Sequence, residues 1–172
     1  MVFFNCKTVK GGKMGEKLKS SAQRVQEALQ RHGLSCEVVQ MQDTTRSAED
    51  AARAVGCEVG QIVKSLIFEG KQSHQPVLVV TSGANRVNEK TIGQKLAESI
   101  KMANPEFVRE ITGFAIGGVP PVGHRHALKI FIDKDLLQYE EIWAAAGTPH
   151  AVFKLTPEDL KTITNGEVIS VK

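Results

Sequence analysis

Ser65-Leu-Ile-Phe-Glu-Gly-Lys-Gln-Ser-His-Gln-Pro-Val-Leu-Val-Val-Thr81 is the stretch of sequence that decides the fold. It contains two short runs rich in Leu, Ile, Val and Phe, residues 65–69 and 77–81, each typical of a β-strand. Residues 70–76 are too few for the helical crossover that joins parallel strands. The stretch therefore predicts an antiparallel hairpin, and we expect an α+β domain with a mixed, mostly antiparallel β-sheet surrounded by helices.

Helix and strand patterns are interspersed around this hairpin. Four further strands are predicted from short runs of Val, Ile and Phe bounded by turn residues, at 36–41, 127–133, 150–155 and 167–171. Because no linker or repeat divides residues 20–172, we expect them to form one domain, preceded by a basic, flexible tail at 1–19. Five helices are predicted from capping residues that precede apolar residues at helical spacing; their candidate N-caps are Ser21, Ser47, Asn88 or Thr91, Asn104 and Thr156.

The composition is that of an ordinary globular protein, with 172 residues of which 41% are apolar and 24% charged. These values argue against disorder and against collagen-like or coiled-coil chains. No apolar run approaches the ~20 residues of a membrane span, and the first residues do not resemble a signal peptide. The three cysteines form no zinc or CxxC pattern. We therefore expect a cytoplasmic protein that has no membrane association and uses no cofactor.

The formal net charge of +3 is unevenly distributed. Residues 1–19 contain five lysines and one glutamate, which leaves 17 basic and 18 acidic residues in the remainder. A basic tail of this kind is usually a solvated segment, and the alternative is an arm that attracts the phosphates of a nucleic acid. The charge alone leaves both interpretations open.

Lys64 opens the first strand of the hairpin, on the face that alternation also gives to Leu66 and Phe68. Lysine is rarely buried without a partner. A lysine at a strand end usually extends its ammonium to solvent. The alternative is a cation directed into a pocket, where it would suit a phosphate or a polarised carbonyl.

The most unusual segment is Gly117-Gly-Val-Pro-Pro-Val-Gly-His124. Paired glycines let backbone N–H groups approach a ligand closely, and two prolines stiffen the turn. Such a loop either connects two elements or presents preorganised amides to an oxyanion or a ribose. It matches neither the Walker nor the GxGxxG pattern, so it predicts no nucleotide-binding motif.

Histidines and nucleophiles give weaker indications. His124 and His126 form an HxH pair that could supply two metal ligands, but no convincing third ligand accompanies them. His150 is either a turn residue or a side chain that faces a cleft. The candidate nucleophiles lack a neighbouring base motif and a GxSxG sequence, which argues against a covalent triad; they are Cys57, Ser65 and Ser82.

Seven segments carry a resemblance to a known family, namely residues 45–52, 60–68, 77–83, 112–124, 132–137, 143–147 and 155–160. In this order they resemble the YbaK/prolyl-tRNA synthetase-associated (aminoacyl-tRNA editing) domain family. No single motif is decisive, but the ordered set runs from about residue 20 to the C-terminus and is specific.

The resemblance implies a mixed α+β domain that hydrolyses the ester of mischarged aminoacyl-tRNA, with tRNA(Pro)-type substrates. Since no synthetase domain is attached, it implies a deacylase that works in trans on the acceptor end, with a prolyl-tRNA synthetase as a candidate partner. Catalysis in this family is described without a protein nucleophile: a water and a ribose hydroxyl of the terminal adenosine are positioned by the Gly-rich loop.

The family's functional residues can be carried over onto matching positions. Its conserved lysine falls on Lys64 and its Gly-rich loop on residues 117–121, so the expected catalytic residues are Lys64, Gly117 and Gly118. No metal-binding residue is expected. The expected substrate-binding residues are Ser65, Val119, Pro120, His124, Gly147 and His150.

The chain departs from some relatives at three places, Met41, Thr148-Pro-His150 and Val152. Relatives have an aromatic residue at the first, a basic residue and a glycine at the second, and an aspartate at the third. These departures bear on amino-acid specificity and on whether activity is retained. The alternative to an enzyme is a binding module of the same fold, which would hold aminoacyl-tRNA or a synthetase without hydrolysis. A metal hydrolase built on the HxH pair is a third hypothesis.

Overall fold

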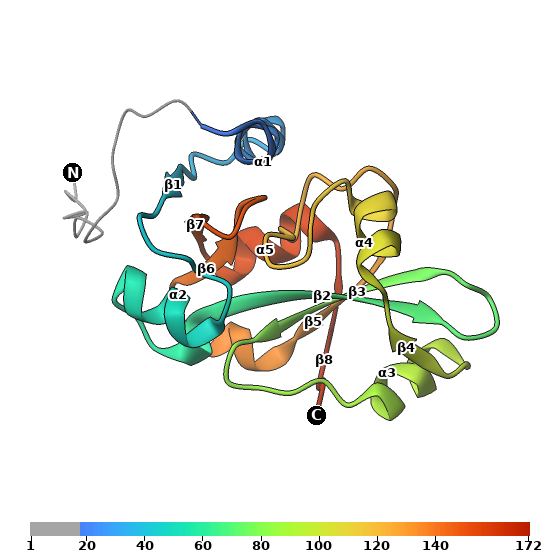
Figure 1. The fold of residues 1–172 in the computed structure, drawn as a ribbon. Coiled ribbons are helices and arrows are strands. Elements are labelled where there is room, and N and C mark those ends of the chain that lie inside the picture. The colour runs from blue at the N-terminus through green and yellow to red at the C-terminus, as the bar shows by residue number, and fades with distance from the viewer. Residues whose placement is uncertain (1–17) are drawn as a thin grey trace.

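Strands β2 (Ile62–Gly70) and β3 (Pro76–Ser82) form the predicted antiparallel hairpin, in a computed structural model that describes residues 18–172. The hairpin lies in the middle of a mixed eight-stranded sheet with the order β1-β7-β6-β2-β3-β5-β8, and β4 pairs with β2 beside this path (Figure 1). The α+β class is therefore confirmed. Most of the predicted tail, 1–19, lies outside the described residues.

The remaining strands are short. They are β1 (Val38–Gln40), β4 (Ile100–Met102), β5 (Lys129–Asp133), β6 (Ile142–Ala145), β7 (Ala151–Leu155) and β8 (Glu167–Ile169). The pairs β1–β7, β6–β7, β2–β3 and β2–β4 are antiparallel. The pairs β2–β6, β3–β5 and β5–β8 are parallel. Strands β4 and β6 were not predicted from the sequence, because strands of three and four residues carry too little alternation to be distinguished from a loop.

Five helices surround the sheet: α1 (Ser20–Arg31), α2 (Ala48–Val55), α3 (Glu89–Leu96), α4 (Pro105–Thr112) and α5 (Pro157–Thr164). Two short 3₁₀ helices, η1 (Val59–Gln61) and η2 (Lys134–Gln138), complete the fold. No helix in the described part of the chain is both long and apolar enough to cross a membrane.

Side-chain caps begin four of the helices as predicted. Ser47, Asn88, Asn104 and Thr156 each accept a hydrogen bond from a backbone N–H of the first turn. The prediction that Ser21 caps α1 was wrong. The Gln23 N–H donates to the carbonyl of Lys19, at 2.9 Å, so the first turn starts earlier and places Ser21 inside the helix.

The two faces of the sheet bury different clusters. Val63 and Ile67 of β2 pack with Val25 and Leu29 of α1 on one face. Phe68 of β2 packs with α3 and β5 residues on the other. Figure 1 shows α1 and α4 on one side of the hairpin and α3 on the opposite side. The period-two alternation of β2 is therefore confirmed, and it decides which side chains reach the cavity described below.

Two strands, β6 and β4, pair with the edge of β2 that faces away from β3, and they leave a gap between them. Strand β6 pairs only with Ile62 and Val63, and β4 pairs only with Phe68, Glu69 and Gly70. Residues 64–67 pair with β3 on one side. On the other side, no strand within residues 18–172 pairs with them. We call residues 64–67 the open edge of β2. An unpaired edge inside a sheet is unusual, because strand N–H and C=O groups normally have partners.

Candidate active site

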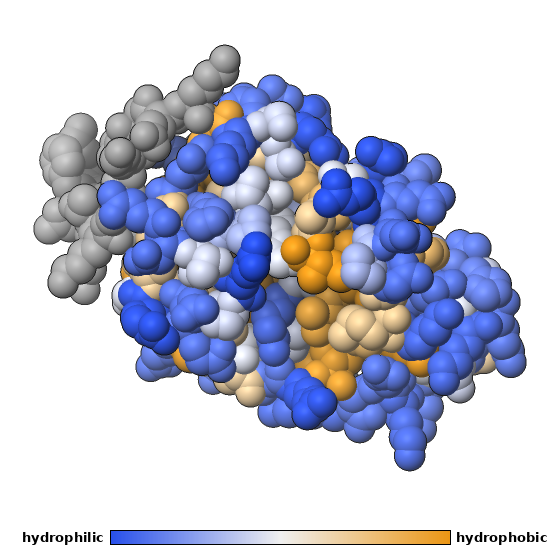
Figure 2. Space-filling view, in the orientation of Figure 1, coloured by the Kyte–Doolittle hydropathy of each residue, from blue (hydrophilic) through white to orange (hydrophobic). Residues whose placement is uncertain are grey.

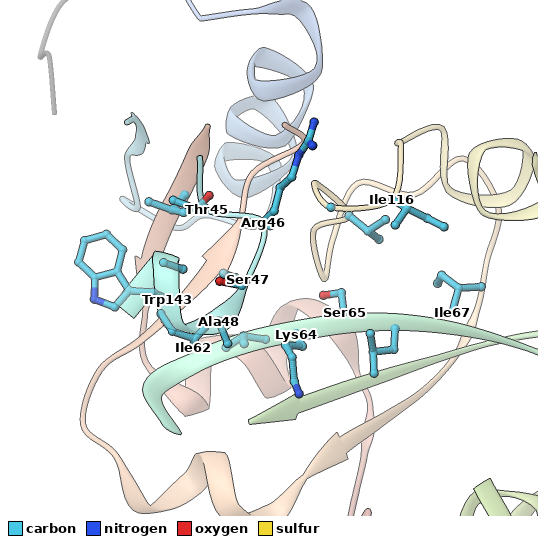
Figure 3. A pocket seen from close by; sticks show the side chains of 18 of the residues that line it. Thr45, Arg46, Ser47, Ala48, Ile62, Lys64, Ser65, Ile67, Ile116 and Trp143 are labelled. Atoms are coloured by element: carbon cyan, nitrogen blue, oxygen red, sulfur yellow. The ribbon is translucent and has the colours of Figure 1, made fainter. Parts of the chain in front are cut away.

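A cavity of about 380 Å³ lies beside the open edge (Figure 3). Residues 62–67 of β2 form its floor, and the ends of the two flanking strands, at 102–103 and 144–145, form its sides. The segment before α2 and the loop that follows α4 contribute Thr45, Arg46, Ser47, Ile116, Gly117 and Val119. The volume falls in the range of small-molecule sites.

The cavity walls are mostly apolar. Ile62, Trp143 and Val152 line one side, and Figure 2 shows an apolar hollow on this face of the molecule, bordered by hydrophilic residues. Met102 and Ile116 contribute to the lining although each is 54% exposed, the highest exposure among the large apolar residues of the described part. An exposed apolar lining of this kind is typical of a site that buries part of a ligand.

Ser65 contributes a polar side chain to the floor of this mostly apolar cavity. Its Oγ is buried, and no residue between 18 and 172 forms a hydrogen bond with it. Figure 3 shows the side chain directed toward the loop that carries Ile116. A buried hydroxyl without a partner costs about 1–3 kcal/mol, and such groups are rare in native structures. The hydroxyl is therefore available to a polar group of a ligand that enters the cavity.

Lys64 lines the cavity, but its side chain extends from the face of β2 opposite Ser65 (Figure 3). Its Nζ donates a hydrogen bond to the carbonyl of Asn85, at 2.8 Å. Burial lowers the pKa of the ammonium, while Glu49 and Asp133 raise it. Burial is the largest of these effects, so the net pKa is lowered. The ammonium lies at the outer wall and not next to the Ser65 hydroxyl (Figure 3).

A buried carboxylate fixes the turn that holds Lys64. Asp133 has no exposed surface, and its Oδ2 accepts hydrogen bonds from Thr81 Oγ1, the Ser82 N–H and Asn85 Nδ2, at 3.0, 3.1 and 2.8 Å. Because Asn85 is bound in this way, its carbonyl presents a fixed acceptor to Lys64. Asp133 is therefore a positioning residue for that lysine.

The residues of the Gly-rich loop differ in whether they line the cavity and in whether their N–H groups are free. Gly117 lines it with a φ of 93°, and Val119 lines it as well. In the described part of the chain the N–H groups of these two residues have no acceptor. The Gly118 N–H, by contrast, donates to the Ala115 carbonyl at 3.1 Å, and its own carbonyl accepts from the Gly147 N–H at 2.8 Å.

Gly118 is consequently a packing residue in this loop. A Cβ on it would lie 2.7 Å from the Thr148 nitrogen and 2.8 Å from the Gly147 carbonyl carbon. This geometry corrects the expectation that Gly118 offers its amide to a developing oxyanion. Among the residues of the 117–124 loop that line the cavity, Gly117 and Val119 are the ones with unbonded amides.

Pro120 and His124 brace the same loop outside the cavity. His124 Nε2 lies 2.6 Å from the Pro120 carbonyl, so Nε2 carries the proton and donates it. Burial lowers the pKa of the imidazole, more than this bond raises it, and favours the neutral ring. Neither residue lines the cavity, and their expected contact with substrate stays a prediction. His126 is exposed, and among residues 18–172 no group of three or more His, Cys, Asp or Glu side chains could hold a metal ion.

The segment 147–150 contacts residues around the cavity but does not line it. Gly147 lies against the carbonyl of Ser21 in α1, and the His150 carbonyl accepts from the Met41 N–H at 2.6 Å. The Pro149 carbonyl accepts from both the N–H and the hydroxyl of Thr45, at 2.6 and 2.8 Å. Gly147 and His150 do not line the cavity, and their expected contact with substrate stays a prediction.

Two of the three departures from the family pattern concern the cavity wall. Val152 lines it directly, and Met41 packs with Val152 and Trp143 in one apolar cluster. Four lining residues were not predicted from the sequence: Arg46, Met102, Ile116 and Trp143. The fold brings these residues together from distant segments; Arg46, Ile116 and Trp143 lie in segments that carry the family resemblance, and Met102 lies outside them.

Residues 42–163 match the model of the aminoacyl-tRNA editing domain family, which is most of the chain. The chain belongs to this family. A crystal structure provisionally described as a trans-editing enzyme for prolyl-tRNA synthetase superimposes on the editing domain with a TM-score of 0.86 and 48% identity, covering 91% of this chain and 99% of that one.

Curated relatives of the editing domain agree with this assignment. YwhH of Bacillus subtilis, described as uncharacterized, is 30% identical over 77% of this chain and 83% of its own length. EbsC of Enterococcus faecalis, provisionally named a Cys-tRNA(Pro)/Cys-tRNA(Cys) deacylase, is 27% identical over 73% of this chain and 76% of its own. The family assignment expected from the seven sequence segments is confirmed.

Proposed function

We propose that this editing domain is a deacylase that acts in trans and hydrolyses the ester of mischarged aminoacyl-tRNA, with tRNA(Pro)-type substrates. The observation that carries the proposal is the apolar cavity, which contains an unpartnered Ser65 hydroxyl and the unbonded amides of Gly117 and Val119. The solved relative described as a trans-editing enzyme supports the tRNA(Pro) class and a prolyl-tRNA synthetase as partner. A substrate of this kind implies a cytoplasmic protein.

In the proposed reaction a water adds to the acyl carbonyl, and the bond from the acyl carbon to the ribose oxygen then breaks. The ribose oxygen is the leaving group and takes one proton of the water; the other proton passes to solvent, and the amino acid is released as a carboxylate. Gly117, Val119 and Ser65 supply donors for the carbonyl oxygen, where negative charge develops. Lys64 supplies a cation for a phosphate near the ester. No protein nucleophile is invoked, and a ribose hydroxyl of the terminal adenosine positions the water.

A deacylation screen of the purified protein against correctly and incorrectly charged tRNAs tests the function. We expect hydrolysis of at least one mischarged tRNA(Pro), with Pro-tRNA(Pro) left intact, and no loss of rate after exhaustive chelation of metal ions. Binding of aminoacyl-tRNA without hydrolysis would instead favour the non-catalytic module. A rate abolished by chelation and restored by metal would favour the metal hydrolase.

Arg46 is expected to contact a phosphate of the tRNA acceptor end. It is exposed and lines the cavity, and it makes no salt bridge with any described residue. Arg46→Gln should weaken tRNA affinity and make the slope of log affinity against log salt shallower by about 0.7–0.9, the contribution of one phosphate contact. The measurement is a salt titration of binding.

Arg53→Gln is the matched control for this prediction. Arg53 lies on α2, a short distance along the chain from Arg46, and pairs with Asp50 at 3.6 Å, with its side chain 78% exposed. Removing it should leave the salt slope unchanged. Equal effects of the two substitutions would show that the arginines act only through net charge.

A further inference from the structure

The open edge of β2 presents main-chain groups to the cavity. The Ile67 carbonyl accepts from the Ala103 N–H on the β4 side, so the main-chain groups of Ser65 and Ile67 point away from β3, and those of Leu66 point toward it. The Ser65 N–H and C=O and the Ile67 N–H have no partner within residues 18–172. Unpaired main-chain groups at a cavity floor, in the middle of a sheet, indicate a ligand that supplies the missing bonds.

An aminoacyl ester has the chemical groups that fit this edge. Its N–Cα–C=O unit is that of one residue, and a residue in a hydrogen-bonded antiparallel pair exchanges two bonds with the residue opposite. We propose that the aminoacyl group binds the open edge as a single strand residue: its α-ammonium donates to the Ser65 C=O, and its acyl carbonyl accepts from the Ser65 N–H. The inference rests on the proposed function and adds a main-chain recognition edge to it.

The pairing also fixes the direction of the substrate side chain. Residues directly opposite in an antiparallel pair place their side chains on the same face, with Cβ atoms about 4.5–5.5 Å apart. An L-aminoacyl side chain would therefore lie beside the Ser65 hydroxyl on the cavity face, with Val63 and Ile67 on either side of Ser65. A D-aminoacyl group paired in the same way would direct its side chain to the opposite face.

The first test substitutes the amide donor. Ser65→Pro removes the N–H that faces the cavity and leaves the β2–β3 ladder intact, because residue 65 does not donate to β3. We expect a folded protein whose deacylation falls about 10²-fold, whereas Ser65→Ala, which keeps the amide, should lose less. Leu66→Pro is the matched control, because it removes a ladder bond opposite Val79. It should unfold the protein, so it tests the assigned directions of the main-chain groups and not ligand binding.

The second test does not require the proline variant to fold. A non-hydrolysable 3′-aminoacylamino-3′-deoxyadenosine is titrated into ¹⁵N-labelled wild-type protein, and amide shifts and hydrogen exchange are followed. We expect the Ser65 and Ile67 amides to shift and to become protected, more with the L- than with the D-aminoacyl analogue and less after N-acetylation.

The outcomes separate the two proposals. Wild-type hydrolysis with an unperturbed Ser65 amide, or with a folded and fully active Ser65→Pro, would overturn the recognition edge and leave the deacylase function standing. Protection of the Ser65 amide without hydrolysis of any charged tRNA would support the edge and overturn the deacylase. An analogue series that never binds, together with no hydrolysis of any charged tRNA, would overturn both.

Discussion

Replacing Lys64 by alanine is expected to lower kcat/KM for deacylation ~10²-fold, which corresponds to about 2.7 kcal/mol of transition-state stabilisation. The reason is charge: a phosphate or polarised oxygen beside the cavity would lose a half-buried ammonium, whose pKa burial lowers and the nearby Glu49 and Asp133 partly restore. The melting temperature should fall only slightly, because the variant loses the single bond from Nζ to the Asn85 carbonyl.

Two control substitutions distinguish the effect of the Lys64 charge from the effect of its hydrogen bond to Asn85. Lys71→Ala, at an exposed position of the hairpin loop, should change neither rate nor stability, and Lys64→Arg should restore part of the rate if charge is what matters. A Lys64→Ala protein that melts early but hydrolyses at the wild-type rate when folded would show that the lysine only anchors the turn at Asn85.

Gly118→Ala is expected to lower the free energy of unfolding by about 2–3 kcal/mol, in the range of overpacking in a close-packed region. The added methyl would lie 2.7 Å from the Thr148 nitrogen and 2.8 Å from the Gly147 carbonyl carbon. Both are backbone atoms, so the two loops must separate, and the bond from the Gly147 N–H to the Gly118 carbonyl would lengthen. Thermal or urea unfolding measures the loss.

Gly117→Ala is the comparison for this prediction. Its nearest neighbours, Arg46 and Pro149, would be 3.8 and 3.9 Å from the new Cβ, so the cost comes only from the φ of 93°. We expect a loss of about 1 kcal/mol. If the two variants were equally stable, close packing between the loops would not be what requires glycine at position 118.

Sequence patterns predicted the hairpin and most helix starts because these depend on neighbouring residues. Asn88, Asn104 and Thr156 cap the backbone a few residues ahead, and alternation along β2 separates Lys64 from Ser65 without reference to the rest of the chain. Ser21 failed as a cap because Lys19 and Gln23 close the first turn before it.

The site could be predicted only in part, because its chemistry depends on contacts between distant segments. Ser65 was a candidate, but its missing partner becomes visible only when β4 and β6 are seen to stop short of it. The sequence predicted that Gly118 faces a ligand, but in the structure it packs against the loop at 147–148. The strands that pattern analysis missed are the ones that bound the cavity.

The short length of the open edge also bears on self-association. A bare strand edge usually attracts a strand of another molecule, and proteins shield such edges to avoid aggregation. Here the bare segment covers only residues 64–67, with β6 before it and β4 after it. A polypeptide strand cannot enter so short an opening between two occupied positions, but a single amino-acid unit can. If the aminoacyl group binds there as proposed, the flanking strands limit the length of what can pair with the edge: a small ligand has access to the main-chain groups, and a strand of another protein does not.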